Sequence, residues 1–264
     1  MVTKLDSLPN INIKEVLGFV PSSIWNITKS KKWTEKIKDF GENKPKRKVT
    51  NKFLPGLKYS SFNPDVAEAI LKYWSKEGEL ILDPFAGRST RAFVALSLNR
   101  QYIGYDVSQY AIDHLNNNTL IKEKAIIYQA DGCELQFNQD KEVDLIFTCP
   151  PYFNLEKYES APNQLTDLKS YDLFIDKISK ALLNCYRVLK DEKYCIWVVG
   201  DFRINKEVKA FHIDVIEKAK YNGFKLHDIV IEQIRSPFIW CRVRENYRLG
   251  ITAKAHQYIL IFKK

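Results

Sequence analysis

Long apolar runs are missing from this sequence of 264 residues, and no segment is long enough to cross a membrane as a helix. The N-terminus also lacks the charged start and apolar core of a secretory signal. Five cysteines are scattered along the chain without a Cys-x-x-Cys pair, which argues against a zinc knuckle or a disulfide framework. The four histidines show no metal-ligand spacing either. We therefore expect a soluble protein of the reducing cytoplasm that binds no metal.

Charge is distributed unevenly along the chain, whose formal net charge is +9 at pH 7. Residues 1–60 hold 13 Lys and Arg against 5 Asp and Glu, and residues 202–264 hold 13 against 6. The middle of the chain, residues 61–201, holds 15 against 21. An acidic centre between two basic flanks is typical of a catalytic body that holds a polyanion such as a nucleic acid. A solvated, lysine-rich surface is the alternative interpretation of the flanks.

Short apolar segments alternate with amphipathic helical segments from residue 63 onwards. This alternation is typical of the α/β class and predicts a doubly wound, mostly parallel, Rossmann-like sheet of seven strands. The last two strands are joined by a loop alone, so we expect them to form a C-terminal antiparallel hairpin. The expected strands are 79–87, 101–108, 125–131, 143–149, 193–201, 225–234 and 256–264.

The first 57 residues differ from the rest of the chain. They carry weak hydrophobic periodicity and include the basic run KPKRK at 44–48, so residues 1–57 are interpreted as a basic N-terminal arm or extension. Residues 58–264 then form a single α/β domain. The sequence shows no internal repeat and no low-complexity tract.

The segment DPFAGRST, residues 83–90, follows the first expected strand. In an open α/β sheet, ligands bind beyond the carboxyl ends of the strands, which is where this segment lies. Gly87 allows the backbone to approach a ligand closely, and a helix that starts near Ser89 presents unpaired N–H groups. Asp106 and Asp131 end the next two strands, and a carboxylate at the second strand end can bind ribose hydroxyls. These features indicate a cofactor of the nucleotide type, whereas a surface turn with a helix cap is the alternative.

The glycine pattern argues against an ordinary dinucleotide-binding loop. Gly87 is the only glycine in the segment, so the pattern G-x-G-x-x-G is not satisfied. Asp83 would also be unfavourable beside a pyrophosphate, because both groups are negatively charged. A carboxylate at this position is better suited to a cationic or amino-bearing ligand.

A second motif, TCPPY at residues 148–152, ends the fourth expected strand. Together, DPFAGRST and TCPPY resemble the motifs of the N6-adenine and N4-cytosine DNA methylases, which use S-adenosylmethionine to methylate exocyclic amino groups of bases. The resemblance covers about residues 58–264, which are therefore expected to be the methyltransferase domain. It implies S-adenosyl-L-methionine as the cofactor and double-stranded DNA as the partner, with the target base flipped out of the duplex. The recognised site, the oligomeric state and an accompanying restriction endonuclease stay open.

The resemblance implies a catalytic role for Cys149, Pro150, Pro151 and Tyr152. The side chain of Cys149 and the carbonyl of Pro150 would accept the two N–H groups of the target amine, which frees its lone pair. Two prolines stiffen the corner and fix the direction of that carbonyl. Tyr152 offers a flat face on which the target base can stack.

Cys149 departs from the pattern of the family, which usually has Asp, Asn or Ser at this position. A thiol is a weak hydrogen-bond acceptor. Cys is nearest in size to Ser, and TSPPY is the commonest form of the motif among N4-cytosine enzymes. The target atom N4 of cytosine is therefore favoured over N6 of adenine. A cysteine nucleophile for C5-cytosine methylation is a third alternative, although that family places its cysteine after the proline.

The resemblance further implies which residues bind the cofactor and DNA. Asp106 would take the ribose hydroxyls, and Asp131 with Cys133 would reach the adenine. The loop 236–255 is the candidate DNA-recognition loop because it interleaves arginines with aromatic residues, and a solvated loop with a buried Trp is the alternative. The expected cofactor-binding residues are Phe62, Asp83, Pro84, Phe85, Gly87, Ser89, Thr90, Asp106, Val107, Ser108, Asp131 and Cys133. The expected DNA-binding residues are Phe153, Trp240, Arg242, Arg244 and Arg248.

Two other functions stay open. An RNA base amino-methyltransferase would use the same chemistry, but such enzymes usually show DPPY and carry a separate RNA-binding domain, which we do not find in the sequence. A non-catalytic nucleic-acid-binding module with a relic methyltransferase fold is the other alternative. The presence of Asp83, Asp106 and Tyr152 argues against such decay.

Overall fold

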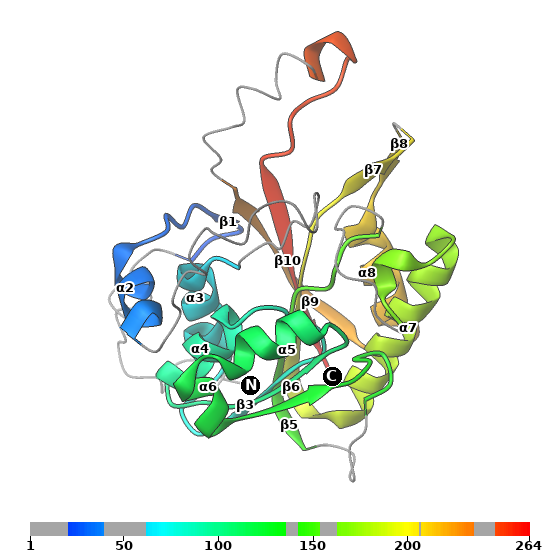
Figure 1. The fold of residues 1–264 in the computed structure, drawn as a ribbon. Helices are drawn as coiled ribbons and strands as arrows, with labels where there is room; N and C mark the ends of the chain where they lie inside the picture. The colour runs from blue at the N-terminus through cyan, green and yellow to red at the C-terminus, as the bar shows by residue number, and fades with distance from the viewer. Residues whose placement is uncertain (1–20, 40–61, 136–141, 154–162, 206, 235–245) are drawn as a thin grey trace, which may run out of the picture.

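The computed structural model describes residues 21–39, 62–135, 142–153, 163–205, 207–234 and 246–264. One sheet of eight strands, in the order β1-β9-β10-β6-β5-β2-β3-β4, forms its centre (Figure 1). These strands are β1 (Ile24–Trp25), β2 (Leu80–Asp83), β3 (Gln101–Asp106), β4 (Ala125–Gln129), β5 (Val143–Thr148), β6 (Leu189–Val199), β9 (Lys225–Gln233) and β10 (His256–Lys263). A separate hairpin pairs β7 (Phe202–Ile204) with β8 (Glu207–Lys209).

Parallel pairing dominates the sheet. The pairs β1–β9, β2–β3, β2–β5, β3–β4 and β5–β6 are parallel, whereas β10 runs antiparallel to both β6 and β9. The predicted fold class, a mostly parallel Rossmann-like sheet with a C-terminal antiparallel hairpin, is therefore confirmed. The expected number of seven strands is wrong, because β1 adds an eighth by pairing Ile24 with Ile231 of β9. A strand of two residues is too short to show hydrophobic periodicity in the sequence.

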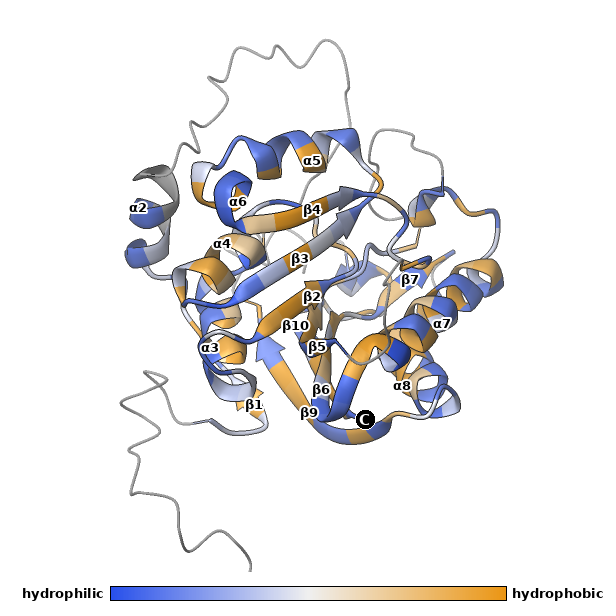
Figure 2. Cartoon of the chain, turned by 90° about the horizontal axis from the view of Figure 1, so that it is seen from below, coloured by the Kyte–Doolittle hydropathy of each residue, from blue (hydrophilic) through white to orange (hydrophobic). Residues whose placement is uncertain are grey.

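Helices cover both faces of the sheet, as a doubly wound fold requires. One hydrophobic cluster joins the sheet to α2 through α6, and a second joins it to α7 and α8. Figure 2 shows the apolar strands between α3 and α4 on one side and α7 and α8 on the other. Among the described residues, no helix has both the length and the apolar composition needed to span a bilayer. The helices are α2 (Lys31–Asp39), α3 (Pro64–Trp74), α4 (Thr90–Ser97), α5 (Gln109–Asn116), α6 (Thr119–Lys124), α7 (Tyr171–Val188) and α8 (Phe211–Tyr221).

The described part of the predicted N-terminal arm packs against the domain. Trp25 of β1 and Trp33 of α2 are each 1% exposed and belong to the first hydrophobic cluster. The indole N–H of Trp33 also donates a hydrogen bond of 2.6 Å to Glu68 of α3. Residues 21–39 are therefore part of the folded domain, and the rest of the predicted arm lies outside the described residues.

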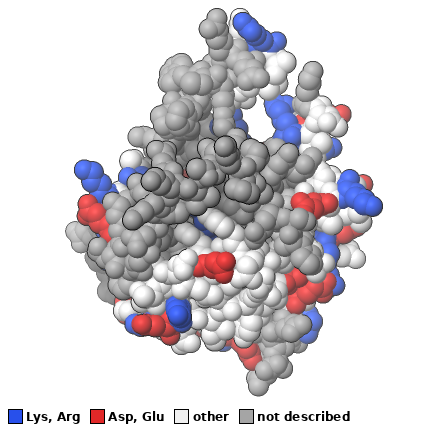
Figure 3. Space-filling view, in the orientation of Figure 1, with Lys and Arg blue, Asp and Glu red and all other residues white. Residues whose placement is uncertain are grey.

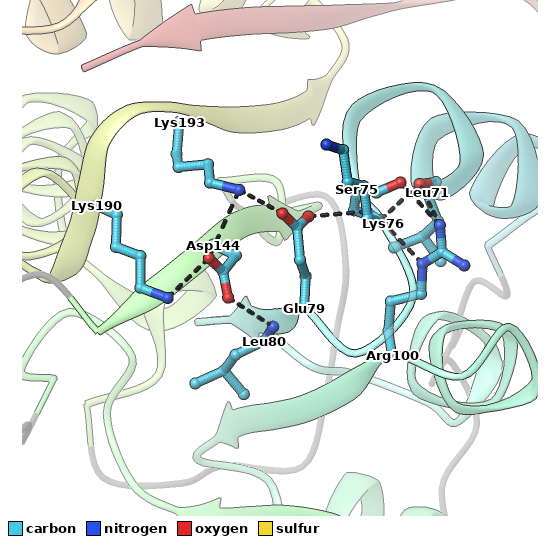
Figure 4. Close-up of polar contacts among 9 residues, drawn as sticks. All are labelled: Leu71, Ser75, Lys76, Glu79, Leu80, Arg100, Asp144, Lys190 and Lys193. Carbon is cyan, nitrogen blue, oxygen red and sulfur yellow. Dashed lines mark hydrogen bonds and ion pairs between the residues drawn. The ribbon is translucent and has the colours of Figure 1, made fainter.

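Ion pairs connect the strands at the amino edge of the sheet (Figure 4). Asp144 of β5 accepts hydrogen bonds from the backbone N–H of Leu80 at 3.1 Å and from Lys190 at 2.8 Å. Lys193 of β6 lies 3.6 Å from Asp144 and also pairs with Glu79. Burial alone would raise the pKa of Asp144, but its hydrogen bonds to Lys190 and Leu80 bring this pKa below the usual value. The charges of Asp144 and Glu79 at this edge are therefore paired with lysines of the protein itself.

We expect Trp33→Ala to lower the free energy of unfolding by about 3–5 kcal/mol, because it empties a large buried volume. Denaturant titration followed by circular dichroism measures this change. Lys32→Ala is the matched control, since Lys32 is exposed and its ion pair with Glu68 should be worth less than about 1 kcal/mol. Equal stability of the two variants would mean that α2 contributes nothing to the folded domain.

Candidate active site

A cavity of about 520 Å³ opens at the carboxyl edge of the central strands. The loops that follow β2, β3 and β5 all contribute to its wall, so the segments DPFAGRST and TCPPY open into one shared space. Most of the residues predicted to bind the cofactor or to act in catalysis lie on this wall. They are Phe62, Pro84, Phe85, Gly87, Asp106, Val107, Ser108, Asp131, Cys149, Pro150, Pro151 and Tyr152.

The carboxylate of Asp106 is fixed at the end of β3 by two backbone donors. The N–H of Gly87 donates to Oδ2 at 2.8 Å, and the N–H of Ser108 donates to Oδ1 at 2.9 Å. Burial raises the pKa of Asp106, although both hydrogen bonds act in the opposite direction. An ionised carboxylate can accept about four hydrogen bonds, so Asp106 retains capacity for a ligand. Gly87 has a φ of +56°, a backbone conformation that other residues rarely adopt.

Asp83 lies beneath the cavity and joins the two motifs. Its Oδ2 accepts hydrogen bonds from Arg91 Nε at 2.6 Å and from the hydroxyl of Tyr102 at 2.9 Å. Its Oδ1 accepts from the hydroxyl of Thr148 at 2.6 Å and from the N–H of Phe85 at 3.2 Å. Because Thr148 ends β5 and Asp83 ends β2, this carboxylate fixes the TCPPY corner against the DPFAGRST corner.

These contacts change the interpretation of Asp83. The sequence suggested a carboxylate that faces a cationic ligand, but Asp83 is fully buried and its charge is matched by Arg91. Arg91 extends the network, since its Nη2 donates to the carbonyl of Phe85 at 2.6 Å. Asp83 therefore positions the loop, and it does not line the cavity.

The TCPPY corner presents Cys149 and Tyr152 from opposite faces of the sheet. Cys149 packs against the first hydrophobic cluster, and Tyr152 packs against the second. The ring of Tyr152 meets Phe202 edge-to-face at 6.0 Å and Phe211 at 6.5 Å between centroids. Such packing restricts the ring to one orientation and leaves its remaining surface to the cavity.

Lys254 is a neighbour of Tyr152 that the sequence did not reveal. Its Nζ lies 5.3 Å from the centroid of the Tyr152 ring, within the range of a cation–π contact. Gly200, directly after β6, makes this approach possible, because a Cβ there would lie 2.1 Å from the Lys254 Nζ. The ring of Tyr152 is thus held by two aromatic rings and one cation.

Besides Asp83, four predicted site residues are buried away from the cavity wall. Ser89 and Thr90 start α4, and both are buried. Cys133 is fully buried in the second cluster, and its backbone N–H donates to Asp131 Oδ1 at 2.8 Å. Cys133 therefore does not line the cavity, whereas Asp131 does. Phe153 is 7% exposed and packs against Phe174, so it does not extend the stacking surface of Tyr152.

The predicted DNA-recognition loop is described only in part. Trp240, Arg242 and Arg244 lie outside the described residues. Arg248 lies on an exposed turn beside Tyr247, which is 84% exposed.

Several polar residues on the cavity wall were missed, among them Glu232, Gln257 and Gln164. Glu232 of β9 is buried, and Gln257 of β10 donates to it from Nε2 at 2.6 Å. Gln164 is 6% exposed, and its amide oxygen has no hydrogen-bond partner among the described residues. Glu232 near the carboxyl end of its strand resembles Asp106 in placement, so the rule that identified Asp106 could have found it. Gln164 lies in a loop, where the sequence carries no such signal.

Solved structures share the fold of this chain. A SAM-dependent methyltransferase from Methanosarcina mazei is 15% identical, with a TM-score of 0.50, over 74% of this chain and 96% of that chain. The [4+2]-cyclase SpnF is 14% identical, with a TM-score of 0.54, over 78% of this chain and 84% of that chain. At these identities the likeness concerns the fold alone, which is that of the SAM-dependent methyltransferases.

The family follows from the sequence. Residues 6–117 and 143–264 match the model of the N6/N4 methyltransferase family, described as DNA methylase, and the chain belongs to this family. The orphan methyltransferase M.BamHII of Bacillus amyloliquefaciens is 40% identical over 55 residues, which are 21% of this chain and 21% of that protein. This match therefore spans about a fifth of the curated relative. S-adenosylmethionine, predicted from the motifs, is the cofactor of the family.

We expect Thr148→Val to lower the free energy of unfolding by about 1–3 kcal/mol, because it removes a donor from the buried carboxylate of Asp83. Thr148→Ser is the control that keeps the hydroxyl, and its loss of one methyl group should cost about 1 kcal/mol or less. Denaturant titration of both variants measures the difference. A valine variant as stable as the serine variant would show that this hydrogen bond does not hold the two corners together.

Proposed function

We propose that this protein transfers a methyl group from S-adenosylmethionine to the exocyclic amino group of a base in double-stranded DNA, with N4 of cytosine favoured over N6 of adenine. The observation that carries this proposal is the single cavity into which the Gly87 corner and the TCPPY corner both open. Methyl transfer needs donor and acceptor atoms in contact, so both molecules must share one space. Membership of the DNA methylase family supports DNA as the substrate.

The residues on the cavity wall fit the cofactor. Asp106 has free acceptor capacity where ribose hydroxyls would lie, and Asp131 follows β4, the next strand. The aromatic ring of Phe62 lies on the same wall. The amide oxygen of Gln164, which has no partner in the described part of the chain, suits a ligand with N–H or O–H donors. When bound, S-adenosylmethionine supplies an electrophilic methyl group on a sulfonium.

The TCPPY corner would hold and activate the target amine. Cys149 Sγ and the carbonyl of Pro150 accept its two N–H groups, which shifts the nitrogen toward tetrahedral geometry and frees its lone pair. Pro151 limits the rotation of the backbone, so the carbonyl keeps its direction at little cost in entropy. Tyr152, held by Phe202 and Phe211, offers a face on which the flipped base stacks.

The size of Cys149 supports cytosine as the target. Cys is close in volume to Ser, the residue of the TSPPY motif that is common among N4-cytosine enzymes. A smaller acceptor than Asp or Asn leaves more room beside the amine.

DNA would approach from the end of the molecule where the cavity opens. The hairpin β7–β8 and the turn at 246–250 both project there (Figure 1). Arg203 is exposed on β7, and Arg248 is exposed at the turn. Figure 3 shows Lys or Arg side chains at this end of the molecule. Positive side chains on two projections beside the opening suit contacts with the phosphates of a duplex.

Identification of the methylated nucleoside tests the proposal directly. The protein is incubated with methyl-labelled S-adenosylmethionine and either duplex DNA or RNA, and the nucleic acid is digested and separated. We expect labelled N4-methylcytosine from DNA. Labelled N6-methyladenine would correct the target atom, whereas label in RNA alone would overturn the substrate. No label in either, with the cofactor bound, would favour a non-catalytic binding module.

Tyr152→Ala should reduce kcat on DNA strongly while leaving affinity for S-adenosylmethionine nearly unchanged. Loss of base stacking, worth about 1–3 kcal/mol, predicts a decrease of at least roughly 5- to 160-fold. Tyr152→Phe keeps the stacking face and should retain most of the activity. Calorimetric titration with the cofactor and steady-state kinetics with DNA give the two readouts. Parallel loss of cofactor affinity and turnover would show that Tyr152 is a structural residue.

A further inference from the structure

Glu232 is a buried carboxyl group on the cavity wall that the mechanism above does not use. It is 4% exposed, and the amide of Gln257 donates to its Oε2 at 2.6 Å. Among the described residues, the structure shows no ion pair between Glu232 and a Lys or Arg side chain. Burial raises the pKa of Glu232, which its hydrogen bond with Gln257 offsets only in part. A carboxyl group that keeps its proton can donate a hydrogen bond as well as accept one.

The strand order places Glu232 on the side of the cavity away from the cofactor. Asp131 follows β4, Asp106 ends β3, Gly87 follows β2 and Cys149 follows β5, and these four strands are consecutive in the sheet. A cofactor that extends from Asp131 past Asp106 to Gly87 would bring its methyl group to Cys149. The space beyond, over β6, β10 and β9, is left for the target base, and Glu232 lines it from β9.

The space between Cys149 and Glu232 has the width of one base. Three strand spacings separate β5 from β9, which is about 14 Å across the sheet. Both side chains lie on the same face, because Phe147 and Val230, two residues earlier on each strand, belong to the same hydrophobic cluster. The two side chains, together with hydrogen bonds of about 3 Å to two neighbouring atoms of the base edge, span this distance.

The chemistry of the base edge requires a donor at that position. Cys149 and Pro150 accept from the amino group, but the ring nitrogen beside that group, N3 in cytosine or N1 in adenine, is itself an acceptor. In its protonated form, Glu232 would supply the O–H that this nitrogen needs, and Gln257 orients the carboxyl group through its other oxygen. An acceptor buried without a donor would weaken binding of the flipped base.

We propose that Glu232, oriented by Gln257, is the base-binding residue that donates a hydrogen bond to the ring nitrogen adjacent to the target amine. This inference rests on the proposed function, and it identifies the residue that recognises the Watson–Crick edge of the flipped base.

A cycle of protein and substrate changes tests this contact. Duplex DNA is prepared with the target base or with its deaza analogue, in which carbon replaces the ring nitrogen. With the wild-type protein, the analogue should lower kcat/KM by roughly tenfold or more. Glu232→Ala should lower kcat/KM on natural DNA by a similar factor. Replacing the target base by the analogue should then lower the kcat/KM of this variant much less than that of the wild type. Glu232→Gln retains an N–H donor and should remain sensitive to it.

Two controls separate a direct contact from a general effect. The analogue also alters the reactivity of the amine, and this change is the same for every variant. The cycle therefore compares the decrease in kcat/KM caused by the analogue between the wild type and the variants. Asp228→Ala removes an exposed carboxylate from the same strand, β9, and should behave as the wild type. If Glu232→Ala fails to fold, Glu232→Met fills the same space without a donor and serves in the same cycle.

Additive losses, in which Glu232→Ala and the deaza analogue act independently, would overturn the inference while leaving the proposed function intact. A loss of affinity for S-adenosylmethionine in Glu232→Ala, with unchanged sensitivity to the analogue, would also overturn it and assign Glu232 to the cofactor. A wild-type protein that methylates no nucleic acid would overturn the proposed function and this inference together.

Discussion

The buried carboxylate of Asp83 is the contact on which the geometry of the cavity depends. It collects hydrogen bonds from Arg91 on α4, Tyr102 on β3 and Thr148 on β5, and Thr148 is 65 residues away in the chain. Because Asp83 is fully buried, each of these bonds is stronger than on the surface, and the loss of one leaves a polar group unpaired. Two loops with different positions in the sequence are thereby fixed relative to each other by one side chain. The stiff TCPPY corner can hold a fixed position only because Thr148, where the corner begins, is bonded to Asp83.

Most of the fold could be predicted from the sequence, because strands and helices with clear periodicity alternate, whereas the short strand β1 has no such pattern. The site could be predicted to the extent that the type of a residue at the end of a strand indicates what that residue binds. Asp106 and Tyr152 do line the cavity, but Asp83 proved to be paired with Arg91, because a sequence does not reveal which charge is already matched. Phe153 follows Tyr152 directly, and its direction into the core depends on tertiary packing against Phe174.

The carboxyl groups at the two edges of the sheet have different kinds of hydrogen-bond partner. At the amino edge, Asp144 is held by two lysines, and its charge is neutralised within the protein. At the carboxyl edge, the amides of the backbone hold Asp106, and the side-chain amide of Gln257 holds Glu232. The backbone donors fix the position of Asp106 without cancelling its charge, so the field beside Asp106 favours a ligand that is itself cationic, as a sulfonium is.

The pairing of β1 with β9 links protection of the sheet to completion of the cavity. β9 would otherwise be the outermost strand, and an uncovered strand invites pairing with a second molecule. The residues that follow β1, Ile27 to Lys29, also form part of the cavity wall. A chain that lacked this segment would expose the edge of β9 to pairing with a second molecule, and it would also lose part of the cavity wall. Selection for solubility alone would therefore preserve a wall of the binding site.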